Sequence, residues 1–280
     1  MTATSAPDVV YIGGVCLRRD RPLDGAMGSE LIARVPSETM PPHARDRERP
    51  AGVEAVHRAY QTAGAQWLAT NTFLVAGSSD AIAETRAAVR LAREASGGLP
   101  VALSLGPGAA PGAYAEAARA AADAGADLVL LETFTSARAA AAAARAVGGC
   151  GLPVVVLLVF DDLGLTLTGR EPVEAGVSLL VEAGADGVGT NCQPPDVLEK
   201  VVPRIAAAAA GTSLPVLVRP SAGIPSRRGE SWVYPWAPEP WATATATLQA
   251  SGATLLGGCC GAGPAHVAAL ARLLAAARGT

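Results

Sequence analysis

The chain has 280 residues, 50% of them hydrophobic and 17% charged, with a net charge of −3. It is long enough to bury a full core in one large α/β domain or in two small ones. The lack of a basic excess excludes nucleic acid and anionic membranes as expected partners.

The first residues are polar, with no basic segment before an apolar one, so no secretory signal is predicted. No apolar run reaches the length of a membrane span. The five cysteines are an odd number, which argues against a disulfide framework and indicates a reducing compartment. We therefore expect a cytoplasmic protein.

Two short phrases alternate along the chain and mark predicted strands. Leu-Pro-Val opens apolar runs, and an (Ala/Ser)-Gly-Ala turn precedes the others. Runs of about five apolar residues are typical of buried parallel strands. Together with a short first run they predict eight strands, near residues 22–24, 66–70, 100–105, 127–132, 153–160, 186–190, 215–219 and 253–256.

Ala-rich segments of helical length separate these strands. They cover residues 79–95, 112–124, 136–147, 172–183, 194–209 and 239–250. Pro172, Pro194 and Pro264 stand where helices begin. Strict strand–helix alternation predicts an α/β fold, a (β/α)8 TIM-type barrel in a single domain over residues 1–280, with an open doubly wound sheet as the alternative.

Two segments flank the first predicted strand. Residues 9–17, within an N-terminal extension over residues 1–19, alternate around Gly13-Gly14 and predict a hairpin that closes the bottom of the barrel. Residues 36–50 are polar and proline-rich, which predicts a mobile loop over the mouth, the open C-terminal end of the barrel.

Three cysteines follow predicted strands at that mouth, where the active sites of such barrels lie. Cys192 follows the sixth strand, and Cys259 and Cys260 follow the eighth, where glycines allow the backbone to turn. Three thiolates without a fourth protein ligand are typical of a catalytic zinc with an open position. A vicinal redox pair and inert core cysteines are the alternatives. Cys16 and Cys150 lie outside this group.

Several motifs follow the predicted strands in chain order: Asp24-Gly25-Ala26-Met27-Gly28, Thr70-Asn71-Thr72-Phe73, Gly106-Pro107, Glu132-Thr133, Gly189-Thr190-Asn191-Cys192 and Gly258-Cys259-Cys260-Gly261. Over nearly the whole chain they resemble the homocysteine-binding barrel family. That family includes betaine–homocysteine and S-methylmethionine–homocysteine methyltransferases and the homocysteine module of cobalamin-dependent methionine synthase. The chain departs from the family where Ser221 replaces an Asn, and the loop after the first strand lacks aromatic residues.

The resemblance implies a zinc-dependent methyltransferase that moves a methyl group onto the thiol of homocysteine to form methionine, with Zn²⁺ held by Cys192, Cys259 and Cys260. It also implies that Asp24 and Glu132 bind the ammonium of homocysteine, and two carboxylates at the mouth suit one cation. A turn cap for Asp24 and a structural salt bridge for Glu132 are the alternatives.

Other substrate-binding residues are expected around these carboxylates. Successive backbone N–H groups of residues 26–29 can form a nest for the substrate carboxylate, in the turn made by Gly25, Ala26, Met27 and Gly28. Thr72 and Phe73 line the donor side or belong to the core. Asn191 is placed at the same site, where its side chain is expected to orient the Cys192 turn more than to touch substrate.

The methyl donor is the least determined feature. The free-standing barrel resembles enzymes that use S-methylmethionine or S-adenosylmethionine, whereas the first two motifs resemble the methionine synthase module and imply a separate methylcorrinoid protein. Betaine is disfavoured, because it needs an aromatic cage, although one could come from Trp232, Tyr234 and Trp236. Acidic residues predicted over the mouth favour a cationic sulfonium: Glu38, Asp46, Glu48, Glu230 and Glu239.

Three further candidates carry less weight, and one alternative is of another class. The pair Asp161-Asp162 could be a site of two carboxylates, but it is more typical of a solvated loop. His266 is expected to have a structural role at the start of the last helix. Arg219 is expected either to contact an anion or to form an ion pair at the rim. A non-catalytic zinc-binding barrel is the alternative to an enzyme.

Overall fold

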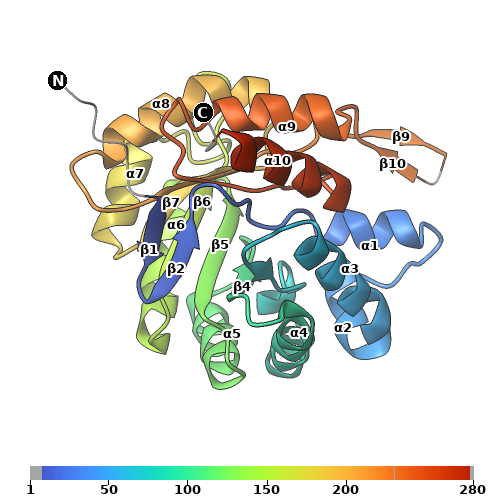
Figure 1. Ribbon diagram of the computed structural model, residues 1–280. Helices are drawn as coiled ribbons and strands as arrows, with labels where there is room; N and C mark the ends of the chain where they lie inside the picture. Colours follow the sequence, from blue (N-terminus) through green and yellow to red (C-terminus); the bar gives the residue numbers. More distant parts are fainter. Residues whose placement is uncertain (1–7, 230, 278–280) are drawn as a thin grey trace.

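The computed structural model describes residues 8–229 and 231–277. Seven parallel strands form one curled sheet in the order in which they follow along the chain, with helices packed outside it (Figure 1). The strands are β3 (Leu68–Ala69), β4 (Val101–Leu105), β5 (Leu128–Phe134), β6 (Val154–Leu158), β7 (Gly187–Asn191), β8 (Val216–Arg219) and β11 (Leu255–Leu256).

An extended segment at residues 22–24 lies between the two edge strands and closes the barrel. The Leu23 amide donates to Leu256 O over 2.7 Å, and the Gln66 amide donates to Pro22 O over 2.9 Å. Three residues carry too few ladder bonds to form a regular strand, so the first predicted strand is present only as this link. The predicted TIM-type barrel is confirmed.

Helices follow the strands and lie close to the predicted bounds. They are α1 (Gly28–Arg34), α2 (Arg45–Glu48), α3 (Pro50–Thr62), α4 (Ala81–Ser96), α5 (Pro111–Asp123), α6 (Ala137–Val147), α7 (Val173–Glu182), α8 (Pro195–Ala209), α9 (Pro238–Thr247) and α10 (Pro264–Ala276). Alanine packs α6 tightly on the sheet, since Ala137, Ala140 and Ala144 are buried. Within the described residues no helix is both long and apolar enough to cross a membrane.

The predicted N-terminal hairpin is present as β1 (Val9–Ile12) and β2 (Val15–Arg18), which pair antiparallel. Ile12, Val15 and Leu17 belong to one buried cluster with side chains from inside the barrel, such as Leu128 and Leu217. The hairpin therefore closes the end of the barrel opposite the mouth.

The segment predicted as a mobile loop is folded. It contains a 3-10 turn (Pro42–Ala44) and α2, and both Arg45 and Asp46 are buried. Arg45 Nη1 donates to Leu31 O over 2.7 Å, and Asn71 Nδ2 donates to Asp46 Oδ2 over 3.1 Å. Composition predicts exposure for such residues, but here buried partners stabilise them.

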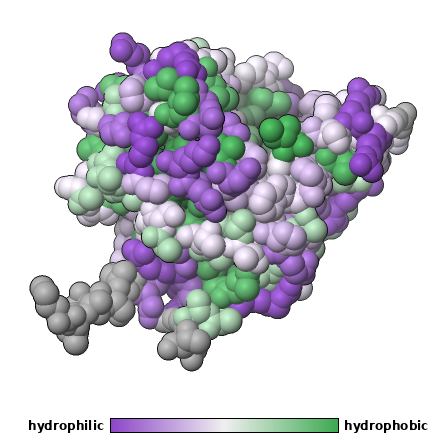
Figure 2. Space-filling view, turned by 90° about the horizontal axis from the view of Figure 1, so that it is seen from above, coloured by the Kyte–Doolittle hydropathy of each residue, from purple (hydrophilic) through white to green (hydrophobic). Residues whose placement is uncertain are grey.

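A second hairpin, β9 (Ser226–Arg228) with β10 (Ser231–Val233), projects beside α1 (Figure 1). On the face shown in Figure 2, polar side chains divide the apolar surface into small areas. That face therefore presents mixed surface rather than one broad apolar patch.

Candidate metal and substrate site

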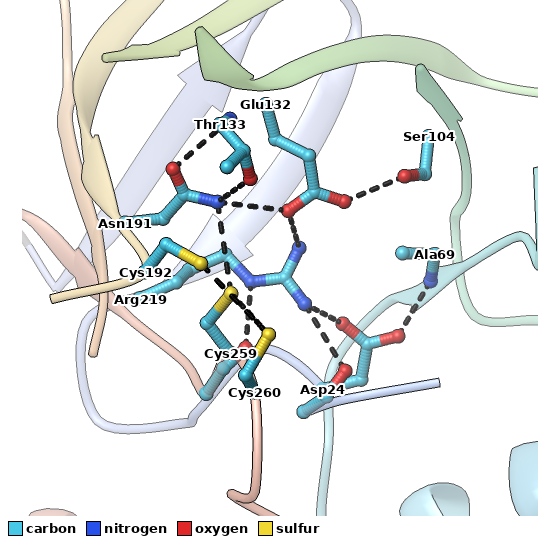
Figure 3. Close-up of polar contacts among 12 residues, drawn as sticks. Asp24, Ala69, Ser104, Glu132, Thr133, Asn191, Cys192, Arg219, Cys259 and Cys260 are labelled. Atoms are coloured by element: carbon cyan, nitrogen blue, oxygen red, sulfur yellow. Dashed lines mark hydrogen bonds and ion pairs between the residues drawn. The ribbon is translucent and has the colours of Figure 1, made fainter. Parts of the chain in front are cut away.

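Cys192, Cys259 and Cys260 converge at the mouth of the barrel (Figure 3). Their sulfur atoms all lie within 4.8 Å of one another. The Sγ atoms of Cys192 and Cys260 are 3.8 Å apart, and those of Cys259 and Cys260 are 4.0 Å apart. Cys16 is exposed, and neither it nor Cys150 belongs to this cysteine cluster.

The local backbone explains how neighbouring cysteines face one cavity. Cys192 follows the end of β7 with φ of 66°, a left-handed conformation that is uncommon for a residue other than glycine. After β11, the Cys259 amide donates to Pro220 O over 2.8 Å, and Gly261 has φ of 76°. This turn breaks the strand alternation that would send Cys259 and Cys260 to opposite faces.

The cysteine cluster offers a donor set that fits zinc. Hydrogen bonds from Cys192 and Cys259 lower the pKa of the Cys260 thiol to about 3, whereas the hydrogen bonds with Cys259 and Cys260 raise the pKa of Cys192. One thiolate is thus favoured, and three so close together need a cation to offset their repulsion. No fourth His, Cys, Asp or Glu joins the group in the described part of the chain, which leaves one position open.

The cysteine cluster forms one wall of a cavity of about 270 Å³. The predicted substrate residues that line this cavity are Gly25, Ala26, Met27, Gly28, Phe73 and Glu132. Ser29 of the predicted nest lines it as well. Residues without a predicted role in substrate binding also line it: Pro42, His43, Ala69, Thr70, Asn71, Leu74, Ser104, Thr133 and Arg219. Asp24, Thr72 and Asn191 do not line it.

Asp24 is buried with both carboxylate oxygens engaged. Its Oδ1 accepts from Trp67 Nε1 at 3.0 Å and from Arg219 Nη2 at 2.8 Å, and its Oδ2 accepts from the Ala69 amide at 2.6 Å. Burial raises the pKa of Asp24 to about 6, against the lowering effect of Arg219. Asp24 therefore faces the guanidinium of Arg219 rather than the cavity.

Glu132 presents its carboxylate to the cavity. Its Oε1 accepts from Ser104 Oγ at 2.5 Å, and its Oε2 accepts from Asn191 Nδ2 at 3.2 Å. Burial raises the pKa of Glu132, and Arg219 opposes that effect. This carboxylate is the predicted ammonium ligand that a substrate in the cavity can reach.

Asn191 connects the carboxylate to the sulfur atoms. Its Nδ2 lies 2.9 Å from Thr133 Oγ1 and 3.7 Å from Cys259 Sγ, and its Oδ1 accepts from the Thr133 amide at 3.0 Å. The Asn191 side chain therefore contacts Glu132, Thr133 and Cys259, whereas it was predicted to orient the Cys192 turn. Thr72 is fully buried and donates to Ser104 O at 2.7 Å, so it supports the cavity wall from behind.

The predicted carboxylate nest is smaller than expected. The Ala26 amide donates to Ala262 O at 3.1 Å, which leaves the amides of residues 27–29. A Cβ on Gly25 would lie 2.1 Å from Ala262 O, so this turn approaches the loop after β11 too closely for any other residue.

The burial of Arg219 between two carboxylates was not predicted from the sequence. Arg219 is 2% exposed and lies between Asp24 and Glu132 (Figure 3), so the ion pair that was one of its two predicted roles is present, but it is buried inside the site. The position of Arg219 as the last residue of β8 was the available signal, because strand ends in such barrels meet at the active site.

Of the acidic residues predicted over the mouth, the four that the structure describes, Glu38, Asp46, Glu48 and Glu239, line neither of the two cavities found there. Asp46 is buried, Glu38 lies 3.9 Å from Arg49, and Glu239 lies 3.4 Å from Arg272. Glu230 lies outside the described residues. A second cavity of about 430 Å³ adjoins the first and shares Gly28, Ser29 and Cys260 with it; Glu30, Trp232 and Tyr234 also line it.

Known proteins are similar to this chain in sequence or in fold. The chain is 31% identical over 294 residues to methionine synthase from Mycobacterium tuberculosis, covering 91% of this chain and 23% of that protein. It is 30% identical over 263 residues to the Mycobacterium leprae methionine synthase, covering 81% of this chain and 21% of that protein. It thus spans less than a quarter of the length of these relatives.

Among solved structures, the metallated form of the homocysteine methyltransferase MmuM from Escherichia coli is similar, with a TM-score of 0.72 and 25% identity over 90% of this chain and 96% of that one. The family model described as homocysteine S-methyltransferase matches residues 22–274. The chain therefore belongs to the homocysteine S-methyltransferase family.

Proposed function

We propose that the chain transfers a methyl group to the sulfur of homocysteine and so forms methionine. The observation that carries this proposal is one cavity of about 270 Å³ lined by both the cysteine cluster and the Glu132 carboxylate. The cysteine cluster suits a thiol that is held through a metal, and the Glu132 carboxylate suits an ammonium group. Family membership supports the same assignment.

Cys192, Cys259 and Cys260 would hold the metal, which we propose to be zinc. The three sulfur donors fit it, and MmuM is known in a metallated form. When bound, zinc would lower the pKa of the acceptor thiol. The ordinary thiol pKa of about 8.5 leaves little thiolate at neutral pH.

The protein residues position the acceptor. Glu132 pairs with its ammonium, the amides of residues 27–29 face its carboxylate, and Asn191 fixes Glu132 relative to Cys259. Holding the thiolate in line with the methyl group removes the entropic cost of bringing two reactants together. We assign the protein's main contribution to this positioning.

For the donor we propose a sulfonium, with S-methylmethionine first and S-adenosylmethionine second. The second cavity opens beside Cys260 and is lined by Trp232, which is 51% exposed, by Tyr234, and by Glu30, whose carboxylate also lies 3.7 Å from Arg34 Nε. Aromatic faces and a carboxylate attract a cation. The sulfonium loses its charge on transfer, so its product binds there more weakly.

A second candidate is a homocysteine-activating subunit that serves a separate methylcorrinoid protein. The matched relatives are methionine synthases, of which the chain spans only 23% and 21%. In this case the second cavity lies under a partner protein rather than around a small donor.

Deuterated homocysteine offered with each donor separates these proposals. The zinc-loaded chain is incubated with S-methylmethionine, S-adenosylmethionine, betaine or methylcobalamin, and deuterated methionine is measured by mass spectrometry. Product from a sulfonium without a partner supports the first proposal. Product from methylcobalamin alone supports the second, and no product from any donor contradicts both.

A further inference from the structure

Arg219 is a buried guanidinium whose donors are only partly used. Its Nε donates to Gly258 O at 3.0 Å, and its Nη2 donates to Asp24 Oδ1 at 2.8 Å and to Gly25 O at 3.3 Å. These bonds fix the guanidinium plane beside the loop that carries Cys259.

The remaining nitrogen, Nη1, has no hydrogen-bond partner within the described residues. Its closest ion-pair atom is Glu132 Oε2 at 3.6 Å, which is too long for a hydrogen bond. A buried donor without an acceptor is costly, particularly on a charged group. Arg219 also lines the substrate cavity, so an acceptor that enters this cavity can supply the missing bond.

The charges around the cavity point to the kind of acceptor. Asp24 is engaged by Trp67, Ala69 and Arg219, which places its charge behind the guanidinium. The cavity therefore presents one carboxylate, Glu132, and one guanidinium, Arg219 (Figure 3). Such a pair matches a zwitterion, with an ammonium beside Glu132 and a carboxylate beside Arg219.

We propose that Arg219 binds the carboxylate of the acceptor through Nη1, together with the amides of residues 27–29, and selects amino-acid thiols over simple aminothiols. The inference rests on the proposed function, since it assigns the polar end of the same acceptor. Arg219 is thus a specificity-determining residue, and Asp24 acts through it by holding the guanidinium in place.

Three thiols test the assignment: homocysteine, 4-mercaptobutyrate, which lacks the amino group, and 3-mercaptopropylamine, which lacks the carboxylate. Their affinities for the zinc-loaded chain are measured by calorimetry for the wild type and Arg219→Lys. Lysine keeps the positive charge near Asp24, but its single ammonium cannot bind the Asp24 carboxylate and the carboxylate of the acceptor at the same time. Homocysteine and 4-mercaptobutyrate should bind about tenfold more weakly or worse, and 3-mercaptopropylamine should change less than about threefold.

A control and a second variant keep the result interpretable. Arg204→Lys alters an exposed arginine that pairs with Glu174 at 2.8 Å, and it should change none of the three affinities. If Arg219→Lys does not fold, the double variant Asp24→Asn with Arg219→Met removes both charges together and should give the same pattern.

Two outcomes overturn the inference while the proposed function stands. Equal losses for all three thiols would make Arg219 only a structural bridge, and unchanged affinities would remove it from recognition. If the wild type binds none of the thiols, the proposed function fails and takes the inference with it.

Discussion

At the scale of single residues, the site depends on three sulfur atoms held together by unusual backbone. Cys192 adopts a left-handed conformation, and the turn after β11 brings Cys259 and Cys260 onto the same cavity. Neither of the two remaining cysteines, Cys16 and Cys150, can supply a missing sulfur ligand, because both lie outside the cysteine cluster.

Each of Cys192→Ala, Cys259→Ala and Cys260→Ala is therefore expected to lose most bound zinc, because two thiolates form an incomplete site. Metal analysis of the purified variants by mass spectrometry checks this. Cys16→Ala is the matched control, since Cys16 is exposed and outside the cysteine cluster, and it should keep about one zinc per chain. Full occupancy in one of the three variants removes that residue from the site.

Glu132→Gln should weaken homocysteine binding by about 2–5 kcal/mol, because a buried charged partner is lost. The amide can still accept from Ser104, so the fold and the zinc content should persist. Calorimetric titration with homocysteine, together with metal analysis, measures both quantities. An unchanged affinity rejects Glu132 as the ammonium ligand.

Gly25→Ala should destabilise the chain, because the new methyl group would meet Ala262 O at 2.1 Å and the ring of Tyr60 at 2.9 Å. Overpacking of this kind costs about 1–3 kcal/mol. Urea unfolding gives the free energy. Gly14→Ala is the control, since a Cβ there meets nothing within 4 Å, and equal stability of the two variants would contradict the close approach.

At the scale of elements, α2 is held by a buried polar contact to Asn71, which lines the substrate cavity. Asp46 accepts from Asn71, which follows β3, and its other carboxylate oxygen has no partner among the described residues. Burial raises the pKa of Asp46 to about 8, and the nearby charge of Glu84 on α4 adds to the rise. The folded state therefore holds a proton that the unfolded state releases near pH 4.

The sign of the resulting pH dependence follows from this raised pKa. The stability associated with Asp46 is fully present below the unfolded pKa and is lost as pH rises toward about 8. Asp46→Asn imitates the protonated form, so it should stabilise the chain more at pH 8 than at pH 5. Denaturant unfolding at the two pH values measures the difference.

Asp123→Asn is the control for that experiment, because Asp123 is an exposed partner of Arg86. It should shift stability by a similar small amount at both pH values. If Asp46→Asn behaves in the same way, Asp46 is ionised in the folded chain and the assignment is wrong.

At the scale of the whole molecule, the barrel was predictable because its pattern is local. Buried parallel strands appear as apolar runs, and alanine-rich helices between them pack against the sheet, as α6 does. The segment at residues 22–24 was found by the same pattern, although its bonds to β11 and to Gln66 make it a link rather than a regular strand.

The polar interior of the site was predictable only in part. Cysteine spacing and motif order indicated the cysteine cluster, but Arg219 and Asp24 are separated by 195 positions and their pairing has no local signal. The burial of Asp46 likewise depends on Asn71, 25 positions away. Such contacts arise from closure of the barrel, which brings strand ends together irrespective of composition.

The central claim is that the three cysteines hold a zinc ion whose open position accepts the homocysteine sulfur. X-ray absorption at the zinc edge, recorded with and without homocysteine, tests it most directly. We predict three sulfur ligands at about 2.3 Å in the free protein and four after homocysteine is added. A sulfur count that stays the same on addition of homocysteine would contradict the account.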